Sequence, residues 1–267
     1  MRNRKAPKAE IAVIGGTGLE SFFESAEEYY VGTPFGLPPP VSVGNISGRR
    51  VAFLPRHCLK HSLPPHKIDY RANIHALNEM GVERVIATNA VGAVNMDFKP
   101  GELAVPHDLI DLTKLRSLTF FDDARFTHVD FSEPYCPEIR KALVEKAAEA
   151  GLSLWERAVY VCTEGPRFET PAEIRMFRAL GGDLVGMTAI PEAVLARESG
   201  ICYGALCFIT NMAAGIAGRI SAKEVTETSK RLSLSIRKVL VEAIKCLPKA
   251  RHCQCASSAT ELRAGEA

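Results

Sequence analysis

Short β-branched runs that alternate with helical patterns constrain the fold of this chain most strongly. Strand-like runs at 10–14, 51–54 and 84–88 each end in small or polar residues, and segments 70–80 and 137–150 have helical spacing of apolar residues. Such alternation is typical of an α/β fold. We therefore predict a single domain in which a central mixed, mostly parallel β-sheet is flanked by helices. Further elements are expected over 103–112, 158–162, 184–187 and 201–210 as extended segments, and from Pro171, from Pro191 and over 221–246 as helices.

The length and composition of the chain fit one globular domain. Its 267 residues are 46% hydrophobic and 24% charged, which is ordinary for a protein with a full core. We expect a flexible tail over 1–9, the domain over 10–248 and a polar tail over 249–267. A net charge of +2 is too small to indicate a nucleic-acid or membrane partner. No apolar run approaches the roughly 20 residues that span a bilayer, and no signal peptide precedes the first strand, so we expect a cytoplasmic protein.

The eight cysteines do not form the framework of a small disulfide-rich domain. Cys162, Cys202 and Cys207 lie in apolar, strand-like segments, so we interpret them as buried thiols. Cys253 and Cys255 stand close together in the polar C-terminal segment, where we expect them to be exposed. A redox or disulfide role for this pair stays open.

Two polar groups follow the first predicted strands, and in open α/β sheets ligands bind beyond the carboxyl ends of the strands. In the segment 15–18, glycines let backbone N–H groups approach a phosphate and Thr17 adds a hydroxyl, although a plain tight turn explains the segment equally well. The segment half-resembles a dinucleotide fingerprint, which makes a nicotinamide-dependent dehydrogenase a rival interpretation, but Ser21 stands where the third glycine should be. Arg56 and His57 suit phosphate recognition or a solvated basic turn.

A metal site is not expected from the sequence. His57, Cys58 and His61 lie close together, but no fourth ligand follows at the spacing of a zinc site.

Four further polar groups follow later strands. A buried amide such as that of Asn211 needs hydrogen-bond partners, so these groups favour a polar pocket. Together with the first two groups they supply what a nucleoside and a phosphate would need. The four are segments 88–92, 163–169, 186–188 with 191–192, and 210–211.

In their order and amino-acid sequence, these motifs resemble those of the family of trimeric purine nucleoside phosphorylases and methylthioadenosine phosphorylases. The likeness covers about residues 10–246, and its most specific motifs are EGPRFET at 164–170 and GMTAIPEAVLARESGICYG at 186–204. The resemblance implies an enzyme that splits purine nucleosides with inorganic phosphate as co-substrate and without a metal or cofactor. It also implies a homotrimer.

The resemblance assigns roles to matching residues. Met187 is implied to lie against the ribose and Phe168 beside the purine, while Glu169 and Asn211 read the base. Asn211 takes the main catalytic role, because its amide can bond N7 of the leaving purine. His128 matches a residue that a neighbouring subunit donates to the ribose site. The implied phosphate site comprises Thr17, Arg56, His57, Asn89, Ala90 and Thr188, with His57 also named as a catalytic residue.

Base specificity follows from the same two base-reading residues. Related enzymes that take 6-aminopurines have an aspartate at the position of Asn211 and a serine at that of Glu169. A carboxylate at Glu169 accepts the N1–H that only 6-oxopurines carry, whereas N1 of adenine is itself an acceptor. Hypoxanthine and guanine are therefore the expected bases.

The site for the 5′ end of the sugar is less specific. The histidine that holds a 5′-hydroxyl in 6-oxopurine enzymes aligns with Ala222, and Val225 follows one turn on, which predicts an apolar wall. Inosine and guanosine therefore compete with 5′-methylthioinosine as substrates. A methylthioadenosine phosphorylase and a non-catalytic nucleoside-binding module are the remaining alternatives.

Overall fold

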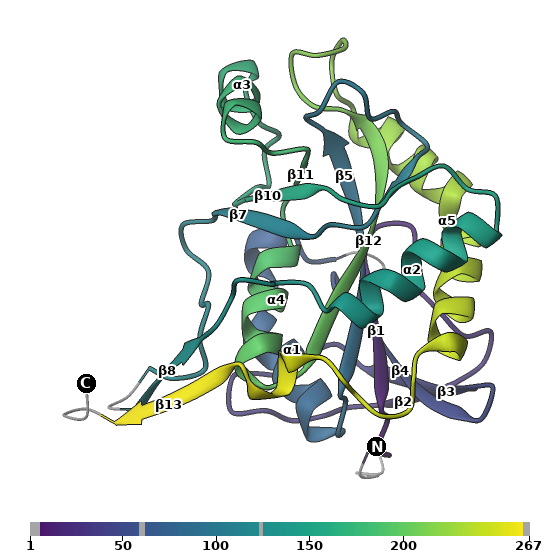
Figure 1. Cartoon of the computed structure of the whole chain (residues 1–267), viewed down its shortest axis with the longest axis vertical. Helices are drawn as coiled ribbons and strands as arrows, with labels where there is room; N and C mark the ends of the chain where they lie inside the picture. Colours follow the sequence, from purple (N-terminus) through teal and green to yellow (C-terminus); the bar gives the residue numbers. More distant parts are fainter. Residues whose placement is uncertain (1–5, 59–61, 123–124, 264–267) are drawn as a thin grey trace.

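The computed structural model describes residues 6–58, 62–122 and 125–263, which fold into one α/β domain around a large sheet (Figure 1). Some helices begin at side-chain caps: the Asp69 side chain accepts the N–H of Ala72 at 2.9 Å, and Thr170 and Glu173 form a capping box. The helices are α1 (Tyr70–Glu79), α2 (Pro137–Glu149), α3 (Pro171–Ala179), α4 (Ala189–Glu198) and α5 (Ala222–Cys246), with 3₁₀ turns η2 (Pro65–Lys67) and η3 (Gln254–Ser257). The strands are β1 (Ile11–Gly15), β2 (Glu27–Tyr29), β3 (Val41–Ile46), β4 (Arg49–Pro55), β5 (Arg84–Ala93), β6 (Leu103–Ala104), β7 (Asp108–Leu112), β8 (Arg125–Val129), β9 (Leu154–Trp155), β10 (Val159–Thr163), β11 (Leu184–Gly186), β12 (Cys202–Met212) and β13 (Ala259–Arg263).

The main sheet is mixed and mostly parallel, which confirms the predicted fold class. Its path runs β2-β3-β4-β1-β5-β11-β10-β7, and β12 pairs with both β5 and β6. Among the described residues, β1 is parallel to β4 and β5, and β12 is parallel to β5 over most of its length. The central strands β1, β4, β5 and β12 therefore bring their carboxyl ends to the same edge of the sheet.

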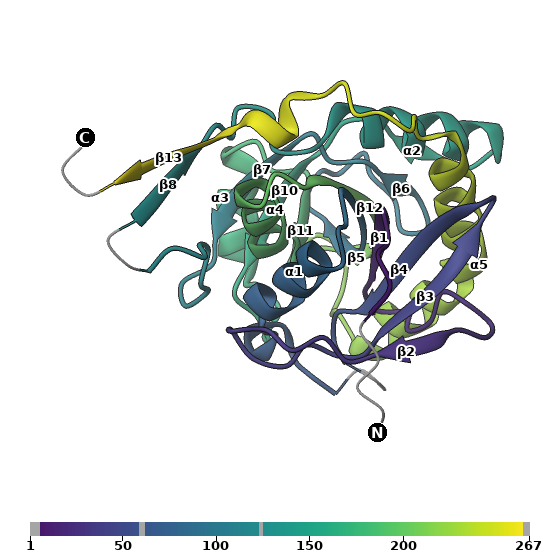
Figure 2. The same ribbon diagram turned by 90° about the horizontal axis from the view of Figure 1, so that it is seen from below.

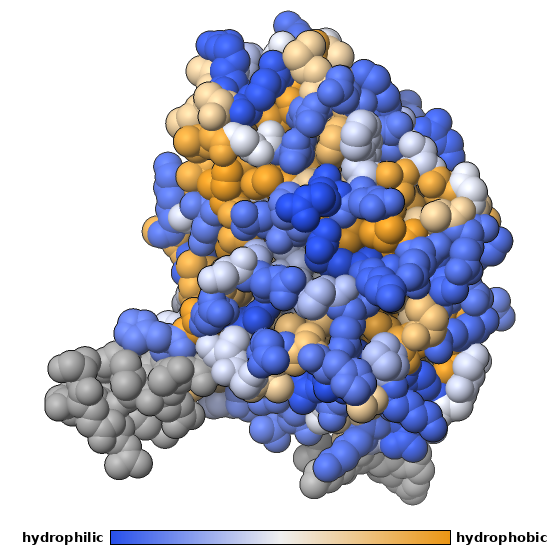
Figure 3. Space-filling model, viewed as in Figure 1, coloured by the Kyte–Doolittle hydropathy of each residue, from blue (hydrophilic) through white to orange (hydrophobic). Residues whose placement is uncertain are grey.

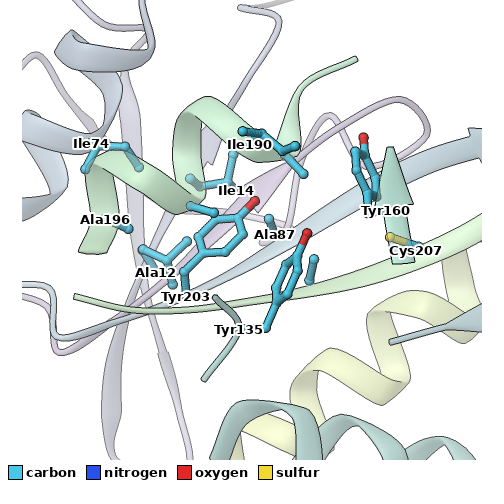
Figure 4. Close-up of a cluster of buried hydrophobic side chains, with 14 of the residues drawn as sticks. Ala12, Ile14, Ile74, Ala87, Tyr135, Tyr160, Ile190, Ala196, Tyr203 and Cys207 are labelled. Atoms are coloured by element: carbon cyan, nitrogen blue, oxygen red, sulfur yellow. The ribbon is translucent and has the colours of Figure 1, made fainter. Parts of the chain in front are cut away.

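Helices cover both faces of this sheet. In Figures 1 and 2, α1 and α4 lie on one face and α2 and α5 on the other. Successive residues of a strand point to opposite faces, so Ala12 and Ile14 of β1 enter the core under α1 and α4 (Figure 4), whereas Ile11 and Val13 enter the core under α2 and α5. This double burial explains why the central strands carry near-continuous apolar runs, such as Val51–Leu54 of β4, rather than alternating apolar and polar residues.

Two strands extend beyond their predicted ends. β5 continues through Asn89 and Ala90 to Ala93, because β12 and β11 still offer backbone partners there. β12 likewise continues past Thr210 through Asn211 to Met212. The short strands β2, β3, β8, β9 and β13 were not predicted, since their residues lack the apolar runs on which the prediction depended.

Both predicted tails are partly ordered against the body. Residues 1–5 lie outside the described part of the chain, but Ala9 is buried and its N–H donates to Met80 O at 2.9 Å. The expectation that Cys253 and Cys255 are both exposed is wrong: Cys255 is buried and Cys253 is half-buried. The reason is that the C-terminal segment docks on the body before β13 pairs with β8 (Figure 2).

The surface is hydrophilic over most of the face in Figure 3, with apolar residues gathered around β7 and β10. Leu115, Met176 and Leu180 are exposed near this region, after β7 and on or just beyond α3. Within the described residues, no helix combines the length and the apolar character of a membrane span.

Candidate active site

The polar groups that end the central strands meet in one cavity of about 220 Å³. Its walls come from β1, β4, β5, β11 and β12, from the loop after β10 and from the start of α5. The structure thus brings together residues that lie as much as 209 positions apart, from Gly16 to Val225. Of the predicted site residues, those that line the cavity are Thr17, Arg56, His57, Asn89, Ala90, Phe168, Glu169, Met187, Thr188, Asn211 and Val225.

A buried ion pair forms the floor at one end of the cavity. The Nε and Nη2 groups of Arg56 donate to the two carboxylate oxygens of Glu192 at 2.5 and 2.8 Å, and Nη1 donates to Thr88 O at 2.8 Å. Glu192 also accepts the hydroxyl hydrogen of Tyr203 at 2.8 Å. Burial by itself would lower the pKa of Arg56, but attraction to Glu192 outweighs it and raises this pKa above its ordinary value. A permanently charged guanidinium thus stands at the cavity with its orientation fixed by Glu192.

A guanidinium has five N–H groups, and these three bonds leave two further donors on Arg56. Gly16 is required for this arrangement, because a Cβ there would lie 2.7 Å from both Arg56 Nη1 and Thr88 O. The N–H of Gly16 itself donates to Thr88 Oγ1 at 3.0 Å. The turn after β1 is therefore built to let the backbone approach Arg56.

Three more polar side chains surround the same end. Asn89 Nδ2 donates to Thr188 Oγ1 at 3.0 Å, and both residues are buried. His57 Nδ1 lies 2.8 Å from Leu63 O. Since a carbonyl can only accept, the proton of the neutral imidazole sits on Nδ1, and the ring's other nitrogen is then an acceptor.

Glu169 occupies the other end of the cavity. Its side chain is buried, and Oε1 accepts the hydroxyl hydrogen of Thr163 at 2.7 Å. Burial is the main influence on this carboxyl and raises its pKa, while the bond from Thr163 partly opposes the shift. A carboxylate has about four lone-pair sites, so Glu169 retains capacity to accept a hydrogen from a ligand.

A β-bulge sets the direction of Asn211. The register of β12 against β5 shifts between Ile209 and Asn211, so Thr210 is an extra residue in the strand. Thr210 Oγ1 lies 2.8 Å from Asn211 Oδ1 as its donor, and Asn211 Nδ2 donates to Met212 O at 2.9 Å. These bonds fix the amide plane and leave the second N–H of Nδ2 as a donor at the cavity.

The loop after β10 is anchored from outside the cavity. Arg116 donates to Glu164 Oε1 at 2.8 Å, to Glu164 O at 2.5 Å and to Met187 O at 3.2 Å. Gly165, at φ +63°, lies so close to Met187 that a Cβ would be 2.5 Å from its Sδ. Arg116 and Gly165 thereby hold the base end of the cavity against Met187.

The outer wall is apolar and open to solvent. Phe168 is 41% exposed although it lines the cavity, and Val225 of α5 and Ile220 complete the wall. Ala222 is exposed and is not among the lining residues, so the structure does not bring it to the cavity. His128 lies on β8, which projects from the body with β13 (Figure 1), and it does not reach the cavity of its own chain.

Several contributors were given no role by the sequence, although Glu192 lies in the polar segment 191–192 named there; they include Ile220, Glu192 and Arg116. Ile220 lines the cavity directly, while Glu192 and Arg116 act through Arg56 and the loop 163–169. Glu192 carried a signal, since an acid next to a helix-opening proline in an apolar segment needs a buried partner. Arg116 and Ile220 lie in loops without such a signal. The sequence also placed His57, Cys58 and His61 close together without predicting a zinc site. Of these, His61 lies outside the described residues.

Comparison with known proteins gives a consistent result. The chain matches the phosphorylase superfamily over residues 10–245. A Pyrococcus furiosus protein named 6-oxopurine nucleoside phosphorylase is 50% identical over 254 residues, covering 92% of this chain and 96% of that protein. A Methanopyrus kandleri protein named "Probable S-methyl-5′-thioinosine phosphorylase" is 47% identical over 251 residues, covering 93% of this chain and 97% of that protein. The crystal structure of a methylthioadenosine phosphorylase from an Antarctic soil metagenomic library superposes with a TM-score of 0.90 at 33% identity, covering 96% of this chain and 92% of that one.

Proposed function

The chain belongs to the phosphorylase superfamily, and from that premise we propose that it is a 6-oxopurine nucleoside phosphorylase. It cleaves the glycosidic bond of inosine and guanosine with inorganic phosphate and releases the free base and ribose 1-phosphate. 5′-Methylthioinosine is proposed as a further substrate. The chemistry uses phosphate as a co-substrate and no cofactor.

One observation carries this proposal: a buried carboxylate and a fixed amide stand at one end of a cavity whose other end holds a buried cation. Glu169 accepts the N1–H of a 6-oxopurine, and the second N–H of Asn211 donates to N7. Arg56, held by Glu192, provides positive charge and donors for phosphate. The distance between these ends is spanned by Met187, which supports the ribose.

The proposed reaction is a displacement at C1′ with oxocarbenium character. Phosphate is held beneath the sugar by Arg56, Asn89, Thr188 and the backbone near Thr17, where its negative charge stabilises the cation that develops at C1′. The bond from C1′ to N9 breaks toward the purine, and Asn211 stabilises the electron density that builds up at N7. No covalent enzyme intermediate is required.

Methylthioinosine follows from the apolar wall. Val225 and Ile220 provide no partner for a 5′-hydroxyl, whereas a methylthio group can pack against them. A methylthioadenosine phosphorylase would share this wall, but the carboxylate of Glu169 would face the lone pair on N1 of adenine. The base-reading residues therefore favour the 6-oxopurine.

Assembly and location stay predictions from the sequence. A homotrimer is supported by the exposed Phe168 at the cavity mouth, by the apolar surface around β7 and β10, and by the projecting strand that carries His128. In such a trimer His128 would complete the ribose site of a neighbour. A cytoplasmic location is expected for an enzyme of nucleoside salvage.

The test is purine release from inosine, guanosine, 5′-methylthioinosine and 5′-methylthioadenosine, each with and without phosphate. We expect phosphate-dependent release of hypoxanthine and guanine, and the ratio of inosine to methylthioinosine measures the preference of the apolar wall. Preferential cleavage of methylthioadenosine would contradict the roles of Glu169 and Asn211. Binding of nucleosides without cleavage would favour a non-catalytic module.

A further inference from the structure

Four cysteine side chains converge at the end of the sheet opposite the cavity. Cys136 occupies the N-cap position of α2, Cys202 begins β12, and Cys253 and Cys255 belong to the segment around η3. All four sulfur atoms lie within 4.8 Å of one another. Cys136, Cys202 and Cys255 are buried, and Cys253 is half-buried.

The spacing of the sulfurs fits shared coordination of one ion better than two covalent pairs. Cys202 Sγ lies 3.4 Å from Cys253 Sγ, far beyond the disulfide bond length of about 2.05 Å. The Cys202 thiol also contacts those of Cys136 and Cys255, so it has no single preferred partner. Four thiolates around a tetrahedral zinc ion, with Zn–S bonds of about 2.3 Å, have S···S separations of about 3.8 Å.

Two guanidinium groups lie near the cluster. Arg251 contacts the Cys202 thiol and donates to Gly200 O at 2.8 Å. Arg84 is fully buried and pairs in register with Cys202 across β5 and β12. Its Nη2 lies 3.6 Å from Glu138 Oε2, and Glu83 Oε2 lies 3.9 Å from Arg84 Nη1 and 3.6 Å from Arg251 Nε. A zinc ion with four thiolates carries a net charge of −2, which the two guanidinium groups would offset in part, since they also pair with these carboxylates.

We propose that Cys136, Cys202, Cys253 and Cys255 form a structural zinc site that fastens the C-terminal segment to the body. Four thiolates leave no open position on a tetrahedral ion, which is the arrangement of structural rather than catalytic zinc. This site departs from the expectation of a metal-free protein.

The position of the site also indicates a structural role. Cys202 and Asn211 are nine positions apart along β12, which corresponds to about 30 Å at about 3.3 Å per residue. The segment that the ion would hold also bonds to the body through Arg84, which donates to Ala250 O at 3.1 Å, and through Glu138, which accepts from His252 N at 2.6 Å. It leads directly into β13, the partner of β8.

The experiment is metal analysis of the full chain, purified under reducing conditions and dialysed after exposure to zinc chloride. We expect one zinc ion per chain, and a loss of that zinc in Cys253→Ser, which alters the least buried ligand. Cys246→Ser is the matched control, because Cys246 is exposed and outside the cluster, and it should keep full zinc. Cobalt(II) in place of zinc should give the thiolate charge-transfer and tetrahedral ligand-field bands of a four-sulfur site.

A thiol count under denaturing conditions with a chelator completes the test. The proposal requires all eight thiols to react. A count of four with no bound metal would show two disulfides instead and overturn the proposal. So would a fully reduced chain that binds no zinc, or zinc that Cys253→Ser retains. Since the cobalt spectrum uses the unaltered chain, the proposal can be tested even if a variant fails to fold.

Discussion

Replacing Glu169 by glutamine should change which purine the enzyme accepts. The side chain keeps its shape, and its carbonyl oxygen can still accept the Thr163 hydroxyl hydrogen that now lies 2.7 Å from Oε1. What the substitution removes is the negative charge at a buried position. The bond to N1–H of hypoxanthine then becomes a neutral one, and the amide N–H₂ can donate to N1 of adenine.

The size of the effect follows from the burial of this carboxylate. A hydrogen bond to a charged group contributes about 1.5–3 kcal/mol, against about 1 kcal/mol for a neutral one. The difference of about 0.5–2 kcal/mol corresponds to a loss of about 2- to 30-fold in kcat/KM for inosine. Activity toward adenosine should rise at the same time, because N1 of adenine no longer faces a carboxylate. The ratio of kcat/KM for inosine to kcat/KM for adenosine should therefore fall by more than either value changes alone.

The assay is kcat/KM for both nucleosides at saturating phosphate. Glu173→Gln is the matched control, since Glu173 lies four positions away, outside the cavity lining, and glutamine preserves a capping box. The control should keep the wild-type ratio. An unchanged ratio in Glu169→Gln would refute the assignment of N1 recognition to this carboxylate.

Further predictions concern the same cavity. Glu169→Gln should raise the Tm at neutral pH. Burial raises the pKa of Glu169 in the folded state, so the carboxyl group contributes stability below its unfolded-state pKa, and this contribution is lost as pH rises through its folded-state pKa. The gain in Tm over wild type should therefore vanish on acidification. Asn211→Ala should lower kcat by about 10²- to 10³-fold with a smaller change in KM for inosine, and a pure KM effect would deny it the leaving-group role. Glu192→Ala leaves the buried Arg56 without its counter-charge, so urea unfolding should show a loss of about 3–5 kcal/mol, together with a raised KM for phosphate. Gly16→Ala places a Cβ 2.7 Å from Arg56 Nη1 and should raise the KM for phosphate, with an unchanged KM for inosine; an unaffected phosphate KM would show that Arg56 does not need this approach.

The sequence by itself determined the fold class and most of the cavity lining. Apolar runs such as 11–14 and 201–210 must be buried on both faces, and only a helix-covered sheet does this for so many strands. Because the carboxyl ends of parallel strands share one edge, polar residues that follow those strands were bound to meet. Arg56 and Asn211 could therefore be grouped from the sequence. Glu169 follows β10, which runs antiparallel to β5 through β11, so its place in the cavity was implied by the family resemblance and not by shared strand direction.

Only the tertiary structure decided which contacts fix the cavity residues at one end of the sheet and which cysteines meet at the other. The bulge that directs Asn211, the pairing of Arg56 with Glu192 and the anchoring of the base loop by Arg116 depend on partners distant in the sequence. The same holds for the cysteines, since the spacing of Cys253 and Cys255 does not reveal that Cys136 and Cys202 lie beside them. Local patterns report which face of an element is buried, whereas contacts between elements are set by packing, and no local pattern encodes them.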